Sequence, residues 1–363
     1  ERTLSLRDQA LAPNAPDIAD ALADIALLRY QQSRFAEAHE AIFRAEAILE
    51  QASGDQSVRL AALLHMLGRT YRERGKLEEG RAALERALDL QQRITGPESI
   101  EVASILESLG MLYVKIGDPE RADAIYGRSL SIRDKVGEQD PIGLAKVLNL
   151  LANTRLYLGR TDDVEAMYRR SHALFEQAYG PDHVWVGRLL NNLGNALVEL
   201  DRAREAVPIL ELARDVQERA LGKDHPDVGY PLASLGDALR QADPVRALAH
   251  YRESAALRRQ LAADAFDSLL VHDLVRIGGL SAALGDATAS ASAMDDAIRV
   301  GSRSPERIDP RLATASIELA QWLVGEGRCN DADPILEQVS QFDRARQRQQ
   351  WSDTVDALRQ RCA

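Results

Sequence analysis

Hydrophobic residues recur along this chain at the three- and four-residue spacing of amphipathic helices. Residues 60–71 carry one such apolar face, residues 84–94 carry a second, and Gly75 lies between them. Both stretches are rich in Ala, Leu, Glu and Arg, which favour helix. The pattern therefore predicts a helix, a tight turn, a second helix and then a longer loop.

The helix–turn–helix pattern repeats every 42 residues without drift. Its clearest mark is a hydrophobic residue followed by Gly or Ala, found at Ile25-Ala26, Leu67-Gly68, Leu109-Gly110, Leu151-Ala152, Leu193-Gly194, Leu235-Gly236, Ile277-Gly278 and Leu319-Ala320. A fixed period of this size indicates one supersecondary unit stacked many times. We therefore predict an all-α solenoid of antiparallel helix pairs, with eight pairs over residues 15–346.

Two short segments flank the eight predicted pairs. Residues 1–10 align with the end of a second helix, which suggests the remnant of a truncated upstream repeat in a fragment of a longer protein. Residues 350–361 place Trp351, Val355 and Leu358 on one helical face. That face is typical of a capping helix that covers the apolar side of a final repeat.

The repeating unit resembles the tetratricopeptide repeat, in the 42-residue form of kinesin light chains. The resemblance rests on Leu-Gly at the mark, Asn-Asn-Leu-Gly at residues 191–194 and the loop Leu-Gly-Lys-Asp-His-Pro-Asp-Val at residues 221–228. It covers the whole chain and implies a right-handed superhelix. It also implies that the first helix of each pair lines a concave face that binds a protein or peptide.

The resemblance further implies which positions face the groove. They lie six, three and two residues before the second residue of each mark, and one, four and five residues after it. Carboxamides there can pair with a peptide main chain, and cations with carboxylates, so an acidic peptide is the expected ligand. A solvated face of mixed charge is the alternative. The candidate groove residues are Arg69, Arg72, Lys146, Asn149, Asn153, Arg188, Asn191, Asn192, Asn195 and Asp237.

Composition argues against several other functions. The 363-residue chain has a net charge of −11 and no basic run, which disfavours nucleic acid as a partner. No apolar stretch approaches the roughly 18 to 20 residues of a membrane span. The seven histidines are scattered, so we expect no catalytic residues, no metal and no cofactor. His183 and His225 lie 42 residues apart in two copies of one loop, which favours a structural role.

The two cysteines bear on location and function. Cys329 lies in the turn before the second helix of the last pair, and Cys362 ends the capping helix. A capping helix that folds back would bring them together as a disulfide, which favours an oxidising compartment; two unrelated thiols are the alternative. Arrays of this kind resemble the periplasmic or extracytoplasmic sensor regions of bacterial transmembrane Ser/Thr kinases. A cytoplasmic regulatory or scaffold domain attached to an effector or DNA-binding domain is the other hypothesis.

Overall fold

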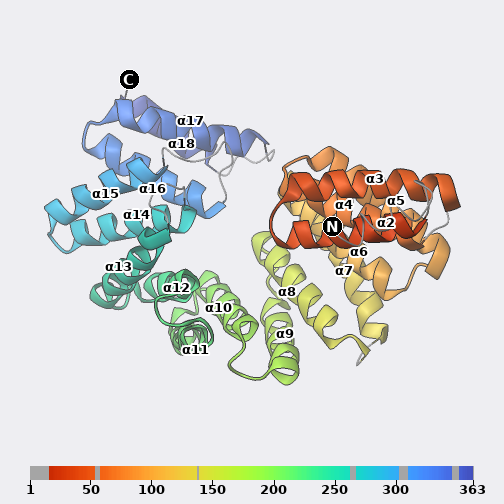
Figure 1. The fold of residues 1–363 in the computed structure, drawn as a ribbon. Helices are drawn as coiled ribbons and strands as arrows, with labels where there is room; N and C mark the ends of the chain where they lie inside the picture. Colours follow the sequence, from red (N-terminus) through yellow and green to blue (C-terminus); the bar gives the residue numbers. More distant parts are fainter. Residues whose placement is uncertain are drawn as a thin grey trace. The chain divides into compact units, whose positions relative to one another are not determined.

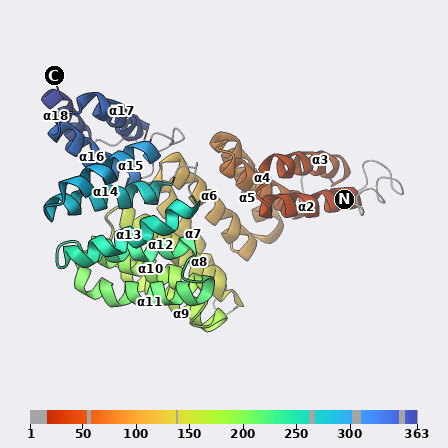
Figure 2. The same ribbon diagram turned by 60° about the vertical axis from the view of Figure 1, so that its left-hand side comes forward.

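The computed structural model describes residues 16–53, 58–136, 139–261, 267–301, 310–345 and 351–362. Every regular element in these ranges is a helix, which confirms the all-α solenoid of helix pairs (Figures 1 and 2). The residues divide into two compact units, Glu1–Arg160 and Thr161–Ala363. The division falls in the turn of the fourth 42-residue repeat.

The first unit contains seven described helices. They are α2 (Pro16–Gln31), α3 (Phe35–Ser53), α4 (Val58–Glu73), α5 (Leu77–Thr95), α6 (Ile100–Ile116), α7 (Pro119–Val136) and α8 (Pro141–Tyr157). The helices α2 and α3, α4 and α5, and α6 and α7 pack as consecutive pairs, and α3, α5 and α7 each also contact the first helix of the next repeat. Residues 1–10, predicted as the remnant of an upstream repeat, lie outside the described residues.

The second unit begins with a second helix, α9 (Val164–Tyr179), followed by four further pairs. Its other elements are α10 (Val184–Glu199), α11 (Ala203–Leu221), the short 3-10 turn η2 (Pro226–Val228), α12 (Gly229–Leu239), α13 (Pro244–Leu261), α14 (Ser268–Ala283), α15 (Ala287–Gly301), α16 (Pro310–Gly325), α17 (Cys329–Ala345) and α18 (Ser352–Cys362). The first helices α10, α12, α14 and α16 are neighbours in that order.

The small residue of the mark lets the two helices of a pair approach closely. Tyr126 and Tyr251 are almost completely buried, and their rings cover Gly110 and Gly236 respectively. A Cβ atom added to Gly236 would lie 2.6 Å from Tyr251 Cε1, which is too close for any side chain. The recurring glycine is therefore required by helix packing.

The turn within each pair uses the left-handed backbone region in most repeats. Gly75, Gly117, Gly159, Gly285 and Gly327 all have positive φ angles, as the spacing predicts. Ser33 and Asp201 occupy the same position and adopt φ of 59° without being glycine. The sixth repeat differs, because α12 ends early and α13 begins at Pro244, one residue ahead of the usual register. The small residues of α13, Ala247 and Ser254, are displaced by one position in the sequence as well.

The C-terminal helix α18 packs against both α16 and α17. Val355 and Leu358 are buried in this contact, and Trp351 packs against the same core. The structure joins Cys329 to Cys362 as a disulfide, with the two Cα atoms 5.6 Å apart. The pairing links the first residue of α17 to the last residue of α18.

Candidate functional site

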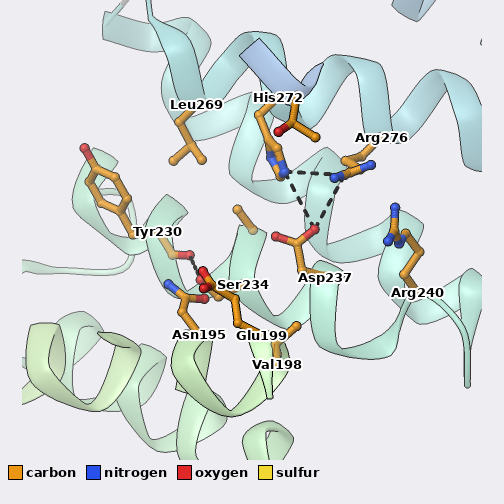
Figure 3. A pocket seen from close by; sticks show the side chains of 12 residues that line it. Asn195, Val198, Glu199, Tyr230, Ser234, Asp237, Arg240, Leu269, His272 and Arg276 are labelled. Carbon is orange, nitrogen blue, oxygen red and sulfur yellow. Dashed lines mark hydrogen bonds and ion pairs between the residues drawn. The ribbon is translucent and has the colours of Figure 1, made fainter. Parts of the chain in front are cut away.

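A pocket of about 340 Å³ opens on the first helices of the second unit (Figure 3). Its lining comes from four successive first helices, α10, α12, α14 and α16. Every lining residue except Leu269 occupies one of the groove positions defined from the sequence. The lining residues are Asn195, Val198, Glu199, Tyr230, Ala233, Ser234, Asp237, Arg240, Leu269, His272, Arg276 and Thr314.

A charged network forms one wall of this pocket. Asp237 Oδ1 accepts a hydrogen bond of 2.7 Å from the hydroxyl of Tyr251. The same oxygen lies 3.5 Å from Arg276 Nε and 3.6 Å from His272 Nε2, as Figure 3 shows. Arg276 also pairs with Glu318. Asp237 is therefore already bound to protein groups, which makes it a fixed part of the wall.

His272 connects the pocket to a fully buried carboxyl. Arg276 Nε donates to His272 Nε2 at 3.4 Å, so the ring proton is assigned to Nδ1, which faces Asp273 Oδ1 at 3.3 Å. Asp273 is completely buried, and its other oxygen accepts from the Ser254 hydroxyl at 2.5 Å. Burial raises the pKa of the Asp273 carboxyl, while the bonds from His272 and Ser254 oppose that rise.

Two polar groups of the pocket are available to a ligand. Arg240 is exposed, and it forms no hydrogen bond or ion pair with any described residue. The partly buried carboxamide of Asn195 likewise has no hydrogen bond within the described part of the chain. Figure 3 shows both side chains at the pocket, Asn195 from α10 and Arg240 from the end of α12. The pocket therefore offers a cation and an amide that combine donor and acceptor capacity.

The other groove candidates of the second unit have different environments. Arg188 is half-exposed and pairs with Asp227 at 2.8 Å, with its guanidinium over the Trp185 ring. Asn191 is only 6% exposed, and its Oδ1 is buried without a hydrogen-bond partner. Asn192 is partly buried on the same helix. Only Asn195 and Asp237 of the sequence-predicted set line the pocket itself.

The candidates of the first unit do not form one cluster. Arg69 lies over the Tyr30 ring, with 4.8 Å from the guanidinium carbon to the ring centroid. Arg72 is committed to Glu73, at 2.6 Å. Lys146, Asn149 and Asn153 lie along α8, with Lys146 exposed. Of these cations, Arg72 is therefore partly neutralised by a local ion pair, whereas Lys146 is exposed.

Two arginines of the first unit act on a neighbouring histidine. His65 Nε2 lies 2.7 Å from the Ser108 hydroxyl and joins α4 to α6. Burial, together with the charges of Arg69 and Arg72, lowers the pKa of His65 to about 4. His65 is therefore neutral at physiological pH and serves as a hydrogen-bonding group between helices.

The two loop histidines have the structural role expected for them. His183 Nδ1 accepts from the backbone N–H of Trp185 at 3.3 Å, and His225 Nδ1 accepts from that of Asp227 at 3.1 Å. Each ring therefore caps the start of a first helix or of the 3-10 turn before it. The recurrence of the loop predicted a structural role for both histidines but did not indicate that each ring caps a helix start.

The pocket also contains groups that sequence reasoning did not single out as site residues. The residues chosen from the sequence were carboxamides and charged side chains, so they did not include Tyr230, His272 or Leu269. Tyr230 and His272 could have been found from the repeat alone, since both lie six residues before the second residue of a mark. Leu269 lies three residues earlier still, outside the positions considered.

Comparison with known families decides the family question. A tetratricopeptide-repeat model matches residues 59–135, 143–216 and 189–260, which together cover more than half of the chain. The chain belongs to the tetratricopeptide repeat family. Its fold is that of a protein-interaction scaffold, a fold that is typically non-catalytic. No curated protein matches the sequence.

Solved structures show the same tetratricopeptide-repeat fold at low identity. The chain is similar to BtubC (BKLC) from P. vanneervenii, with 22% identity, a TM-score of 0.54, and coverage of 64% of this chain and 96% of that one. It is similar to the apo form of the quorum sensor NprR from B. thuringiensis, with 13% identity, a TM-score of 0.63, and coverage of 79% and 77%. It is also similar to a Rap protein complexed with Competence and Sporulation Factor, with 12% identity, a TM-score of 0.60, and coverage of 96% and 97%.

The described residues contain neither a candidate membrane-spanning helix nor a candidate metal site. None of the helices that the structure describes has the length and apolar character required to cross a membrane. Within the same residues, no group of three or more His, Cys, Asp or Glu side chains is arranged to hold a metal ion.

Proposed function

We propose that this tetratricopeptide array captures a polypeptide ligand along the first helices of its second unit. The observation that carries the proposal is the pocket itself, which draws on four successive first helices and in which Asn195 and Arg240 have no partner among the described residues. An extended peptide presents a repeating series of N–H and C=O groups. A carboxamide recognises such a main chain whatever the peptide's side chains are.

A peptide selection tests this proposal directly. The whole chain is used to select binders from a displayed peptide library, and the selected peptides are titrated by fluorescence polarisation. We expect the double variant Asn195→Ala, Arg240→Ala to bind at least about tenfold more weakly, because it removes the two pocket side chains that have no hydrogen bond within the described part of the chain. Asn330→Ala, which removes an exposed carboxamide from α17, is the matched control.

The stability of the double variant must be checked in parallel. Unchanged circular dichroism and thermal unfolding would separate a lost contact from a lost fold. Selected peptides that bind wild type and double variant equally well would remove Asn195 and Arg240 from the ligand site. An array that selects no peptide at all would contradict the function proposed here.

We also propose that the array is the ligand-sensing region of a larger bacterial signalling protein, outside the cytoplasmic membrane. A transmembrane Ser/Thr kinase is the attached protein that we favour. The Cys329–Cys362 disulfide supports an oxidising compartment, because structural disulfides are rare in the cytosol. Among proteins of this fold, NprR is described as a quorum sensor.

The competing proposal is a cytoplasmic regulatory or scaffold domain that controls an attached effector or DNA-binding domain. The coding sequence upstream of Glu1 discriminates between the two. A kinase domain followed by an apolar span supports the sensor, whereas an effector domain without a span supports the alternative. Thiol counting under denaturing, non-reducing conditions on protein from its native host adds a second test, since two free thiols would argue for the cytoplasm.

A further inference from the structure

Two buried arginines occupy the same place in two repeats but have different partners. Arg133 on α7 and Arg258 on α13 both lie four residues after a buried serine, Ser129 and Ser254. Each serine donates to the carbonyl oxygen of the first helix, at Ala103 and Gly229 respectively. These contacts show that the third and sixth pairs are superimposable at this point, despite the one-residue slip.

Arg133 uses all three of its nitrogens. Its Nε donates to Glu107 at 2.5 Å, its Nη2 donates to Ser104 at 3.0 Å, and its Nη1 pairs with Asp140, the N-cap of the next first helix. The guanidinium is only 4% exposed, so these contacts replace the water that it loses. The third pair therefore holds a buried cation with a full set of acceptors.

Arg258 has a hydrogen-bond acceptor for only one of its three side-chain nitrogens among the described residues. Its Nη1 donates to Asp267, again the N-cap of the next first helix, at 3.3 Å. Its Nε and Nη2 are buried and have no hydrogen-bond partner. These are the two nitrogens whose counterparts in Arg133 bond to Glu107 and Ser104.

The missing acceptors correspond to two residues of the pocket. The positions of Glu107 and Ser104 are occupied in the sixth repeat by Ala233 and Tyr230, 126 residues later. Ala233 and Tyr230 both line the pocket in the second unit. The Tyr230 ring lies over the guanidinium, 4.1 Å from its central carbon, and is 39% exposed. The position of the Glu107 carboxylate in the third pair thus corresponds in the sixth pair to a place beside Ala233, at the wall of the pocket.

We propose that Arg258 is a carboxylate-recognition site for the polypeptide ligand of this pocket. A carboxylate of the ligand would pass over Ala233, with rotation of the Tyr230 side chain, and accept hydrogen bonds from Nε and Nη2. It would take the position that Glu107 holds beside Arg133. A charge-assisted bond of this kind at a buried guanidinium is stronger than a neutral one.

The carboxylates nearby leave this position open. Asp273, the other buried carboxyl of the region, is bound by Ser254 and His272 and forms no ion pair with Arg258. Asp237 is held by Tyr251, and Arg276 and His272 lie on either side of it. Asp267 accepts from the N–H groups of Leu269 and Leu270 in addition to Arg258. A further acceptor for Nε and Nη2 has to come from outside the described chain.

The test follows the side-chain Nε–H resonance of Arg258 in the whole chain by nuclear magnetic resonance. The signal is assigned by its disappearance in Arg258→Lys. Sodium acetate is the probe, with sodium chloride at equal ionic strength as the control and inorganic phosphate as a second anion. We expect acetate to shift the Arg258 signal saturably and chloride to leave it unchanged.

A variant that copies the third pair provides the decisive comparison. In Ala233→Glu the introduced carboxylate should pair with Arg258, so its signal starts at the shifted position and apparent acetate affinity falls at least about tenfold. Ala233→Gln, of equal size but neutral, should block acetate without producing the full shift. Should Ala233→Glu fail to fold, the wild-type titration decides alone.

Specific outcomes would overturn the inference. They are an Arg258 signal that acetate leaves unmoved, a response to phosphate without one to acetate, or an Ala233→Glu protein that responds like wild type. The inference rests on the proposed function only for the statement that the carboxylate belongs to a polypeptide. An acetate response without any selected peptide would refute peptide capture and keep the anion site, whereas peptide binding without an acetate response would do the reverse.

Discussion

The third helix pair, α6 and α7, and the sixth, α12 and α13, share one apolar framework but differ in their polar contacts. In both, a buried tyrosine covers the glycine of the mark and a buried serine bonds to the first helix. In the third pair the buried cation is fully bonded by protein groups, and in the sixth it is not. Apolar and small residues therefore maintain the repeat, while polar residues at equivalent positions differ in whether the described protein groups complete their hydrogen bonds.

The largest expected difference between the two pairs concerns loss of the arginine. Arg133→Met should lower the free energy of unfolding of the third pair by about 3–5 kcal/mol, because it leaves Glu107 buried beside an apolar group. Arg258→Met should lower that of the sixth pair by no more than about 1 kcal/mol, because it removes two donors that already lack partners and one bond to Asp267, which keeps its backbone donors. Native-state hydrogen exchange of α7 and α13 amides measures the two effects separately.

A surface substitution calibrates this measurement. Glu120→Ala, at an exposed position of α7, should cost no more than about 1 kcal/mol, the contribution of one acidic residue near a helix N-terminus. Equal losses of stability for Arg133→Met and Arg258→Met would show that the two arginines are energetically equivalent, contrary to the comparison.

The second expected difference concerns pH and the contacts between successive first helices. His65 in the second repeat bonds to Ser108 in the third. The equivalent residues are Asn191 in the fifth repeat and Ser234 in the sixth. The pKa of His65 is lowered to about 4 when folded, whereas an unfolded histidine takes up its proton near pH 6.5. Acidification from pH 7 to pH 4 should therefore weaken the α4–α6 contact by about 2–3 kcal/mol.

The variant His65→Asn isolates this effect by copying the residue found in the later repeat. The pH dependence of α4 and α6 amide protection in wild type minus that in His65→Asn gives the contribution of the histidine alone. The α10–α12 contact, which has Asn191 instead, should show no such contribution. A difference curve that stays flat between pH 7 and pH 4 would mean that His65 ionises freely in the folded chain.

The smallest expected difference concerns the two covering tyrosines. The Tyr251 hydroxyl bonds to Asp237, whereas the residue equivalent to Asp237 in the third repeat is Met111 and the Tyr126 hydroxyl has no hydrogen bond to a described residue. Tyr251→Phe should cost about 1–2 kcal/mol and Tyr126→Phe less than about 0.5 kcal/mol. Thermal unfolding of the two variants, compared at equal pH and salt, measures both; a larger loss for Tyr126→Phe would reverse the assignment.

The helix pairs could be predicted because their signals are local and periodic. Apolar spacing, the glycine of the turn and the small residue of the mark all recur at 42 residues, and each has a steric cause. The pocket residues other than Leu269 occupy positions that recur with the same period, although only Asn195 and Asp237 were among the site residues named from the sequence. The irregular sixth turn was visible too, since the small residues there are displaced by one position.

The partners of the side chains could not be predicted in the same way. Arg133 takes two acceptors from α6 and one from the N-cap residue of α8, and no spacing along the chain indicates that they meet. The spacing likewise does not indicate that Arg188 pairs with Asp227 from the following loop. Nor does it indicate that Asn191 is almost fully buried. Such contacts depend on packing between repeats, which the 42-residue period does not specify.

The bond between Cys329 and Cys362 has a consequence for the order in which the second unit loses structure. The short helix α18 packs against α16 and α17, and a short helix with few contacts opens before longer helices with more neighbours. Here a covalent link spans 33 positions and holds the outer ends of α17 and α18 together. Detachment of α18 alone is thereby prevented, and the last helices have to separate from α16 as one cooperative block.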